Sequence, residues 1–258
     1  MVNTPRTLGM GNTFIAVSDD DSAALGNPAG LALIRDGMVS VGNLGVTKQE
    51  DHWYSAYIVP SSSDEVQGMA LSMSKTKDKE KNTRLDRSSW SAGQYYSEGV
   101  AVGLNLQYLR ASDDTTGTKG TAFGVNLGVL YQLPAPPGGR SPGTIGLLVQ
   151  NPNEPKILGV KQPRVISVGV AMRPSSGLLV AADAYNVLNE AGAQREESAG
   201  IELEPVPGIC LRGGYLNEAG IYTLGAGIKG NSFHLDAGWA SKDGGNDETA
   251  YVGMSFIF

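Results

Sequence analysis

Several residue types are scarce in this 258-residue chain, and each scarcity excludes a class of protein. The single cysteine, Cys210, rules out an intramolecular disulfide and makes a thiolate metal cluster implausible. The two histidines, His52 and His234, lie in no metal-ligand spacing and beside no serine or cysteine nucleophile motif. We therefore expect no catalytic residues, no cofactor and no metal site.

Long apolar runs and long basic runs are also missing. No run of about 18 apolar residues occurs, which excludes a transmembrane helix but not a membrane barrel, whose alternating faces average to a middling hydropathy. The net charge is −6, so nucleic-acid binding has little support. The most basic stretch, Lys75–Arg87, has acids mixed in, and we interpret it as a solvated loop.

Apolar side chains alternate with small or polar ones along much of the chain. The pattern is clearest at 100–110, 123–132, 165–173 and 233–239. In the first of these runs Val100, Val102 and Leu104 share one face, while Gly103 and Asn105 share the other. A period of two with a small or polar second face is typical of a membrane β-barrel.

Such runs predict about fourteen strands, each close to the ten or so residues that cross a bilayer at a tilt. Short connections at 174–176, 205–207 and 229–231 alternate with longer polar ones at 76–87, 112–120, 152–163, 189–195 and 242–248. We expect the longer set on one rim, outside the cell, and both termini on the periplasmic side. The expected strands are 38–47, 52–60, 66–75, 88–96, 99–111, 121–133, 143–151, 164–173, 177–188, 196–204, 208–215, 220–229, 231–241 and 249–258.

Residues 1–36 differ from the rest and form a separate segment, followed by the barrel at 37–258. Acids followed by Ala-Ala-Leu within Ser18–Ile34 predict a short helical turn, which breaks at Gly26-Asn27-Pro28. The strands at 38–47 and 52–60 carry apolar residues on both faces. That is expected where lipid lies outside a strand and a plug inside, although an error in register would give the same pattern.

The chain ends on an alternating strand whose apolar residues are Val252, Met254, Phe256 and Phe258, with Gly253 on the other face. This ending resembles the C-terminal signal by which the bacterial outer-membrane assembly machinery recognises its clients. It implies outer-membrane lipid and that machinery as partners. The last strand of a soluble sandwich would also alternate, with residues such as Val125 and Phe256 meeting in a shared interior.

The N-terminal block Thr7–Val17, followed by acids and Asn27–Ala32, is similar to the signature of FadL-like outer-membrane proteins, and the PorV/PorQ branch looks closest. Later stretches at 146–151, 167–174 and 200–207 fit as well. The resemblance implies an all-β fold: a closed antiparallel transmembrane barrel of about fourteen strands with a small N-terminal hatch. It implies that the plug motif, Asn27, Pro28, Ala29 and Gly30, lies in the lumen.

Two functions follow from this resemblance and both stay open. The transporter branch takes hydrophobic molecules from outside and releases them sideways through the barrel wall. The PorV branch is associated with protein secretion and surface attachment, which implies a scaffold or adaptor for an exported protein. Transporters of this type capture their ligand with long apolar outer loops. The loop around 113–120 is short and polar, which argues against ligand capture of that kind. A soluble β-rich enzyme is a third alternative.

Polar residues on the second face of several strands are candidates to line the lumen. Buried against a plug, such groups need partners or water, so they are expected to tie the plug to the wall or to select a solute. The aromatics Tyr108, Tyr131 and Trp239 suit an interfacial girdle. The lumen candidates are Asn105, Asn126, Asp183, Glu202, Arg212, His234 and Asp236.

Two motif-like stretches carry no expected function. Gly225–Gly230 fits a dinucleotide-binding pattern but lies in a predicted strand that runs into a turn, where that site needs a helix N-terminus. Asp19-Asp20-Asp21 lacks the spaced ligands of a calcium loop. A solvated or helix-capping acid cluster is the interpretation that we favour.

Overall fold

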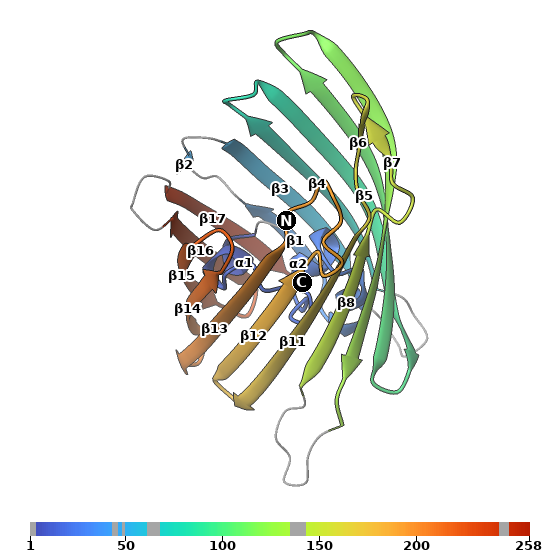
Figure 1. Ribbon diagram of the computed structural model, residues 1–258. Coiled ribbons are helices and arrows are strands. Elements are labelled where there is room, and N and C mark those ends of the chain that lie inside the picture. The colour runs from blue at the N-terminus through green and yellow to red at the C-terminus, as the bar shows by residue number, and fades with distance from the viewer. Residues whose placement is uncertain (1–3, 43–45, 48–49, 61–67, 135–142, 243–247) are drawn as a thin grey trace.

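One antiparallel sheet that closes on itself makes up most of the molecule (Figure 1). The computed structural model describes residues 4–42, 46–47, 50–60, 68–134, 143–242 and 248–258. The barrel strands are β1 Met38–Gly42, β3 Glu50–Val59, β4 Gly68–Asp78, β5 Thr83–Ser97, β6 Val100–Asp113, β7 Thr118–Gln132, β8 Thr144–Gln150, β11 Val165–Ser175, β12 Leu178–Tyr185, β13 Glu196–Val206, β14 Ile209–Leu216, β15 Ile221–Lys229, β16 Phe233–Lys242 and β17 Glu248–Ile257.

The first and last barrel strands pair with each other and close the sheet. β1 runs antiparallel to β17, from Met38 opposite Ile257 to Gly42 opposite Gly253. Gly37 and Phe258 extend this seam by exchanging two backbone hydrogen bonds of 2.9 and 3.0 Å. The two-residue strand β2, Val46–Thr47, pairs with β17 further along. The predicted closed, fourteen-stranded antiparallel barrel is confirmed.

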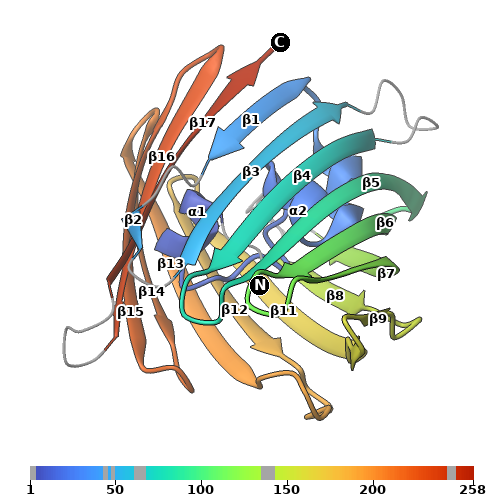
Figure 2. The same ribbon diagram turned by 90° about the horizontal axis from the view of Figure 1, so that it is seen from above.

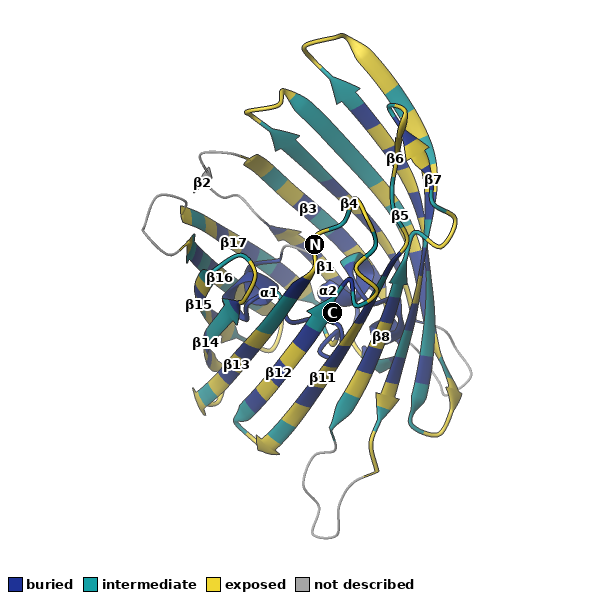
Figure 3. Ribbon diagram, viewed as in Figure 1, coloured by how far each residue is buried: buried dark blue, intermediate teal, exposed yellow. Residues whose placement is uncertain are grey.

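Burial alternates along nearly every strand, so that Figure 3 shows stripes of buried and exposed residues around the wall. The bulky apolar residues point outward: Val168, Val170 and Met172 of β11 are 39, 50 and 62% exposed, while the intervening Gly169 and Ala171 are buried. Phe256 is half exposed as well. The alternative of two stacked sheets is wrong, because these side chains meet in no shared interior.

The strand positions agree with the sequence prediction to within a few residues, with two exceptions. The stretch 76–87, interpreted as a solvated loop, is mostly strand: β4 continues to Asp78 and β5 begins at Thr83. Likewise the loop expected at 112–120 shrinks to a turn between Asp113 and Thr118. Charged residues are tolerated here because the long β4–β7 hairpins project beyond the rest of the wall (Figure 1).

The barrel has two unlike rims. We call the rim that holds Phe258 and the turns β11–β12, β13–β14 and β15–β16 the C-terminal rim, and the opposite one the far rim. The far rim carries a small hairpin, β9 Lys156–Ile157 with β10 Val160–Lys161, inside the predicted loop 152–163. The prediction that these connections share one rim is therefore right for 152–163 and 189–195 and also for the β4–β5 and β6–β7 turns, but the predicted lengths of 76–87 and 112–120 are wrong. The connection 242–248 lies mostly outside the described residues.

The residues before β1 form three short helical elements, α1 Pro5–Gly9, α2 Ser22–Leu25 and the 3-10 helix η1 Pro28–Leu33. Thr4 caps α1 through a reciprocal capping box with Thr7, and Pro5 occupies the first helical turn, where a missing N–H costs nothing. The sequence predicted the turn at α2 but not α1. Figure 2, looking down on the barrel, shows these elements inside the ring of strands.

Candidate functional site

Residues 4–34, which we call the N-terminal segment, fill the middle of the barrel. α1 contacts β14–β17, and η1 contacts β4–β7, so the segment reaches opposite sides of the wall. Almost all of its side chains are buried. Everything that could pass through the interior must therefore pass this segment.

A row of glycines lets the backbone of the segment lie directly on the wall. Gly68, Gly93, Gly103 and Gly128 are register partners on four adjacent strands, β4 to β7. A Cβ added at Gly103 would lie 2.2 Å from the backbone nitrogen of Ala29, and one at Gly128 would lie 2.0 Å from the side-chain oxygen of Asn27. Any larger residue in this row would push η1 off the wall.

The Asn27-Pro28-Ala29-Gly30 motif forms the start of η1 and the turn that precedes it. The Asn27 side-chain oxygen accepts a hydrogen bond from Ala29 N at 3.2 Å, which caps η1, and Pro28 follows at the first position. The Asn27 amide donates to Ile15 O at 2.8 Å and to Val129 O of β7 at 3.4 Å. At Gly30 a Cβ would lie 1.9 Å from Ser18 O. The motif thus joins two parts of the segment to the wall.

A buried ion network ties α1 to β13, β14 and β16, on the side of the barrel opposite the glycine row. Glu202 of β13 accepts hydrogen bonds from Arg6 Nε at 2.9 Å and from Arg212 Nε at 2.7 Å. Arg212, whose side chain is fully buried, also donates to Asp236 at 2.6 Å. Lys229 adds a weaker contact to Glu202 at 3.4 Å. Three of the predicted lumen residues, Glu202, Arg212 and Asp236, are therefore neighbours, and Arg6 of the segment bonds to Glu202 at their centre.

Arg6 also reaches the acid cluster of its own segment. Its Nη1 atom pairs with Asp19 at 2.5 Å and with Asp20 at 2.8 Å. Burial lowers the pKa of Arg6, but the carboxylates of Asp19, Glu202 and Asp20 outweigh it and raise the pKa well above its ordinary value. Arg6 lies in no notable sequence pattern, and the sequence analysis missed it.

Each of the three consecutive aspartates also has a partner of its own. Asp19 also pairs with Arg173 of β11 at 2.6 Å, and Asp20 accepts a bond from Ser22 N at the start of α2. Asp21 accepts a 2.5 Å hydrogen bond from the Tyr54 hydroxyl, and burial together with the charge of Asp20 raises the pKa of Asp21 to about 8. The expectation of a solvated cluster is wrong for Asp20 and Asp21, which are mostly buried, but Asp19 is exposed at the edge of the segment. The helix-capping role holds for Asp20.

Two further polar contacts hold the segment between these anchors. Asp183 of β12 accepts backbone hydrogen bonds from Phe14 at 2.7 Å and from Ile15 at 3.0 Å. Thr223 of β15 accepts one from Gly11 N at 2.9 Å. Side chains of the wall thus satisfy N–H groups that an irregular buried segment would otherwise leave without partners.

The remaining predicted lumen residues are placed inside but do not touch the segment through a described hydrogen bond. Asn126 donates to Asn105 at 3.2 Å, and Asn105 donates to Ser91 at 2.7 Å, which makes a polar ladder across β5–β7. His234 lies on the inner face of β16, half-buried. In the C-terminal signal, Met254, Phe256 and Phe258 point outward, and Gly253 faces inward opposite Gly42.

A cavity of about 580 Å³ lies inside the far rim. Its upper wall is an apolar cluster in which Leu109, Ala111 and Ile157 are buried, and the β9–β10 hairpin covers one side. Polar groups including Arg87, Gln107 and Asn126 line its lower part, and Leu25 of the N-terminal segment forms part of its floor. The size is that of a pocket for a small organic molecule. Seven of the lining residues are apolar and nine are polar, among them the cations Lys81, Arg84 and Arg87.

A second cavity, of about 340 Å³, lies at the C-terminal rim on the other side of the segment. It is bounded by Ala16, Val17 and Leu33 of the segment and by Ala171 and Leu179 of the wall. An apolar cluster of Phe14, Ile15 and Leu148, with Leu25 packed against it, directly precedes Ala16 and Val17 in the segment. We call this cluster the apolar partition: Leu25 lines the far-rim cavity, and Ala16, the neighbour of Ile15 in the chain, lines the second cavity.

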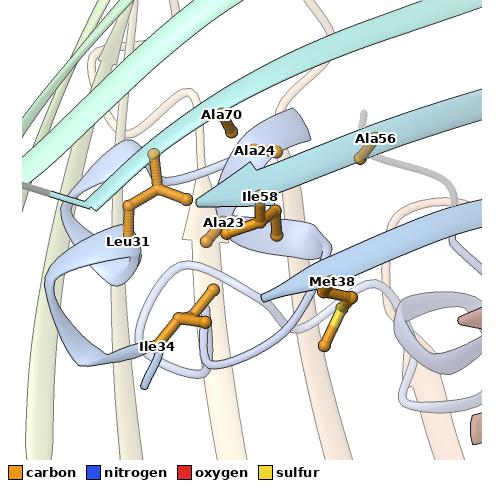
Figure 4. Close-up of a cluster of buried hydrophobic side chains, with 8 residues drawn as sticks. All are labelled: Ala23, Ala24, Leu31, Ile34, Met38, Ala56, Ile58 and Ala70. Carbon is orange, nitrogen blue, oxygen red and sulfur yellow. The ribbon is translucent and has the colours of Figure 1, made fainter. Parts of the chain in front are cut away.

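A separate apolar cluster joins the segment to β1, β3 and β4. Ala23, Leu31 and Ile34 pack against Met38, Ile58 and neighbouring wall residues in one buried cluster (Figure 4). Leu31 and Ile58 are fully buried, and each such side chain contributes about 1.5–3 kcal/mol. This packing explains the apolar inner faces of β1 and β3, where Tyr54, Ala56 and Ile58 face the segment.

No helix in the described part of the chain is long and apolar enough to cross a membrane. Within the same residues, no group of three or more His, Cys, Asp or Glu side chains could hold a metal ion.

These features define a closed fourteen-stranded barrel with an internal N-terminal segment, the fold of FadL-like proteins. The toluene transporter TodX of Pseudomonas putida superposes with a TM-score of 0.71 at 10% identity, covering 97% of this chain and 96% of TodX. A FadL homologue of Pseudomonas aeruginosa gives 0.64 at 11% identity, covering 100% and 98%. No family profile matches the sequence, and no curated protein is similar enough to count as a relative.

Proposed function

We propose that the protein lies in the bacterial outer membrane and lets small hydrophobic molecules cross it passively. The observation that carries this proposal is the pair of internal cavities, of about 580 and 340 Å³, on the two sides of the N-terminal segment, with the apolar partition next to residues that line both. In this proposal an apolar molecule follows the apolar side of the far-rim cavity, at Leu109 and Ile157, to Leu25 and the partition, away from the cations Lys81, Arg84 and Arg87 that line the rest of that cavity. The toluene transporter TodX, which shares the fold, supports a hydrophobic cargo.

In this proposal the N-terminal segment is the plug, and its partition is the gate. Phe14 and Leu25 are the side chains that must move, since they pack against Ile15 and Leu148 in the partition. The anchors at Glu202, Asp183 and the glycine row keep the rest of the segment in place while the gate opens. The C-terminal rim then faces the periplasm, as the predicted position of both termini requires.

The route that we propose ends at the C-terminal rim. The resemblance implied release sideways through the wall, but strand pairing is continuous from β3 to β17 across the described residues. The register shifts, at 95/97, 172/175 and 203/206, all lie at the C-terminal rim. The smaller cavity opens there, which makes it the more direct exit.

Uptake of an uncharged hydrophobic dye into liposomes tests this function. Liposomes with the protein should take up dye faster than empty ones, and Ala111→Trp, which places an indole ring inside the far-rim cavity, should reduce the gain. The control Ala226→Trp places the same side chain on the outer wall, where Ala226 is exposed. Equal uptake by protein-containing and empty liposomes would refute the proposal.

A scaffold or adaptor for an exported protein is the second candidate. The well-anchored N-terminal segment favours it, because a segment that fills the lumen suits a barrel through which no molecule passes. Crosslinking in intact envelopes followed by pull-down distinguishes the two candidates. A specific exported polypeptide would support the adaptor. Recovery of only lipid and assembly factors would count against it.

A further inference from the structure

The outer face of β3–β7 changes from apolar to charged along the strands. The register places outward-facing residues in rows, and the first rows, starting from the C-terminal rim, are apolar. Charge begins abruptly at the fourth row. The rows are Val59–Met69–Ala92–Leu104–Leu127, then Tyr57–Leu71–Trp90–Leu106–Val125, then Ser55–Met73–Ser88–Tyr108–Phe123, then Trp53–Lys75–Asp86–Arg110–Thr121, and last Asp51–Lys77–Arg84–Ser112–Lys119.

Cations exceed carboxylates in the two charged rows. Asp51 is paired with Lys79 at 2.7 Å, and Asp86 lies 3.8 Å from Lys75. Lys77, Arg110 and Lys119 have no ion pair among the described residues. This part of the wall therefore carries excess positive charge next to its apolar belt.

The rest of the far rim is different. There Arg164 pairs with Glu190 at 3.1 Å and Arg195 pairs with Glu197 at 2.9 Å. Their charges are neutralised locally. These two arginines differ in this respect from Lys77, Arg110 and Lys119 on β4, β6 and β7, among the strands that project furthest in Figure 1.

A depression of about 290 Å³ lies in the outer wall at the boundary between the third and fourth rows. Lys75 and Arg110 line it above, with Asp86 between them, and Ser88 offers a hydroxyl. Trp53, Met73 and Tyr108 complete the lining and continue into the apolar belt. The depression can hold an anionic group whose apolar tail runs down the belt.

We propose that this depression binds the phosphate group of a membrane lipid, with Lys75 and Arg110 as its ligands. Arginine and lysine both recognise phosphate oxygens, and Trp53 and Tyr108 suit the headgroup level. The acyl chains would lie over Met73 and Leu71, which are more than half exposed. This inference rests on the proposed membrane location but not on transport.

Tryptophan quenching by brominated lipid tests this site. In a variant with Trp90→Phe and Trp239→Phe, only Trp53 fluoresces, and it lies in the depression. The variant is placed in phosphatidylcholine vesicles containing either brominated phosphatidic acid or brominated phosphatidylcholine. Because each cation near a membrane surface contributes about 1 kcal/mol, and Asp86 offsets part of this, we expect about tenfold preference for phosphatidic acid.

Adding Lys75→Gln and Arg110→Gln to the single-tryptophan variant should remove this preference. The matched control, Arg164→Gln with Arg195→Gln, removes the same number of cations from the same rim and should keep it. A wild-type preference near one, or equal losses in both double variants, would overturn the proposal. Inorganic phosphate, added at constant ionic strength, should leave the quenching of Trp53 by brominated phosphatidic acid unchanged. Loss of that quenching would overturn the proposal, since it would identify a site for the free phosphate ion.

The same experiment separates this inference from the proposed function. Absence of quenching by brominated phosphatidylcholine would refute the membrane location and the lipid site together. Dye uptake by the Lys75→Gln, Arg110→Gln variant should stay at the wild-type rate. If neither the wild type nor this variant takes up dye but the preference for phosphatidic acid remains, transport is refuted and the lipid site is not.

Discussion

Glu202→Gln removes the charge at the centre of the buried network and leaves its shape. Glu202 is the shared acceptor for Arg6 and Arg212, and its side chain is 5% exposed. Breaking a buried ion pair by removing one partner costs about 3–5 kcal/mol. Arg6 keeps Asp19 and Asp20, and Arg212 keeps Asp236, so we expect the lower end, about 3 kcal/mol.

That cost should appear as undocking of the N-terminal segment from the wall. A cysteine introduced at Ala23, which is fully buried in the cluster of Figure 4, reports undocking in a Cys210→Ser background. When opening is fast, labelling by a water-soluble maleimide follows the open population. A cost of about 3 kcal/mol then raises the labelling rate about a hundredfold.

The control is Glu197→Gln on the same strand, because Glu197 points outward and pairs only with the exposed Arg195. Glu197→Gln should leave the labelling rate of the Ala23 cysteine as it is in the Cys210→Ser background. Circular dichroism should show an intact barrel in both Glu197→Gln and Glu202→Gln. If Glu202→Gln labels no faster than Glu197→Gln, the network does not hold the segment, and our reasoning about its anchoring is wrong.

Three other changes test separate parts of the structure. Gly103→Val, which drives a side chain into the η1 backbone, should expose the Ala23 cysteine reporter, whereas Gly213→Ala, whose Cβ would have no neighbour closer than 3.8 Å, should not. The raised pKa of Asp21, about 8, makes docking weaker as pH rises from about 4 to 8, so protease cleavage of the segment should increase over that range in the wild type and stay flat in Asp21→Asn. Phe258→Ala removes the ring that stacks on Tyr57 beside the seam and should lower the amount of heat-resistant folded barrel on gels more than Phe233→Ala does.

Alternation predicted the wall because each strand has one apolar face. The period of two at Val168, Val170 and Met172 marks outward positions whatever lies inside the barrel. The same rule failed at 76–87, where charged residues in a hairpin above the apolar belt resemble a solvated loop. Local composition does not distinguish a polar loop from a strand that continues beyond the apolar belt into water.

The interior was less predictable because its contacts join residues far apart in the chain. Glu202 and Arg212 were expected inside, but nothing near Arg6 indicated that it would meet them. The glycines at 103 and 128 were recognised only as small residues on the second face. Their alignment with Gly68 and Gly93 depends on the register of four strands, which the sequence does not state.

Diffraction or a density map with a brominated aromatic probe tests the central claim most directly. Our account predicts bromine density in the far-rim cavity beside Leu109 and Ile157, in contact with Leu25 of the segment. Bromine confined to the outer belt, with that cavity empty at saturating probe, would contradict passage through the interior.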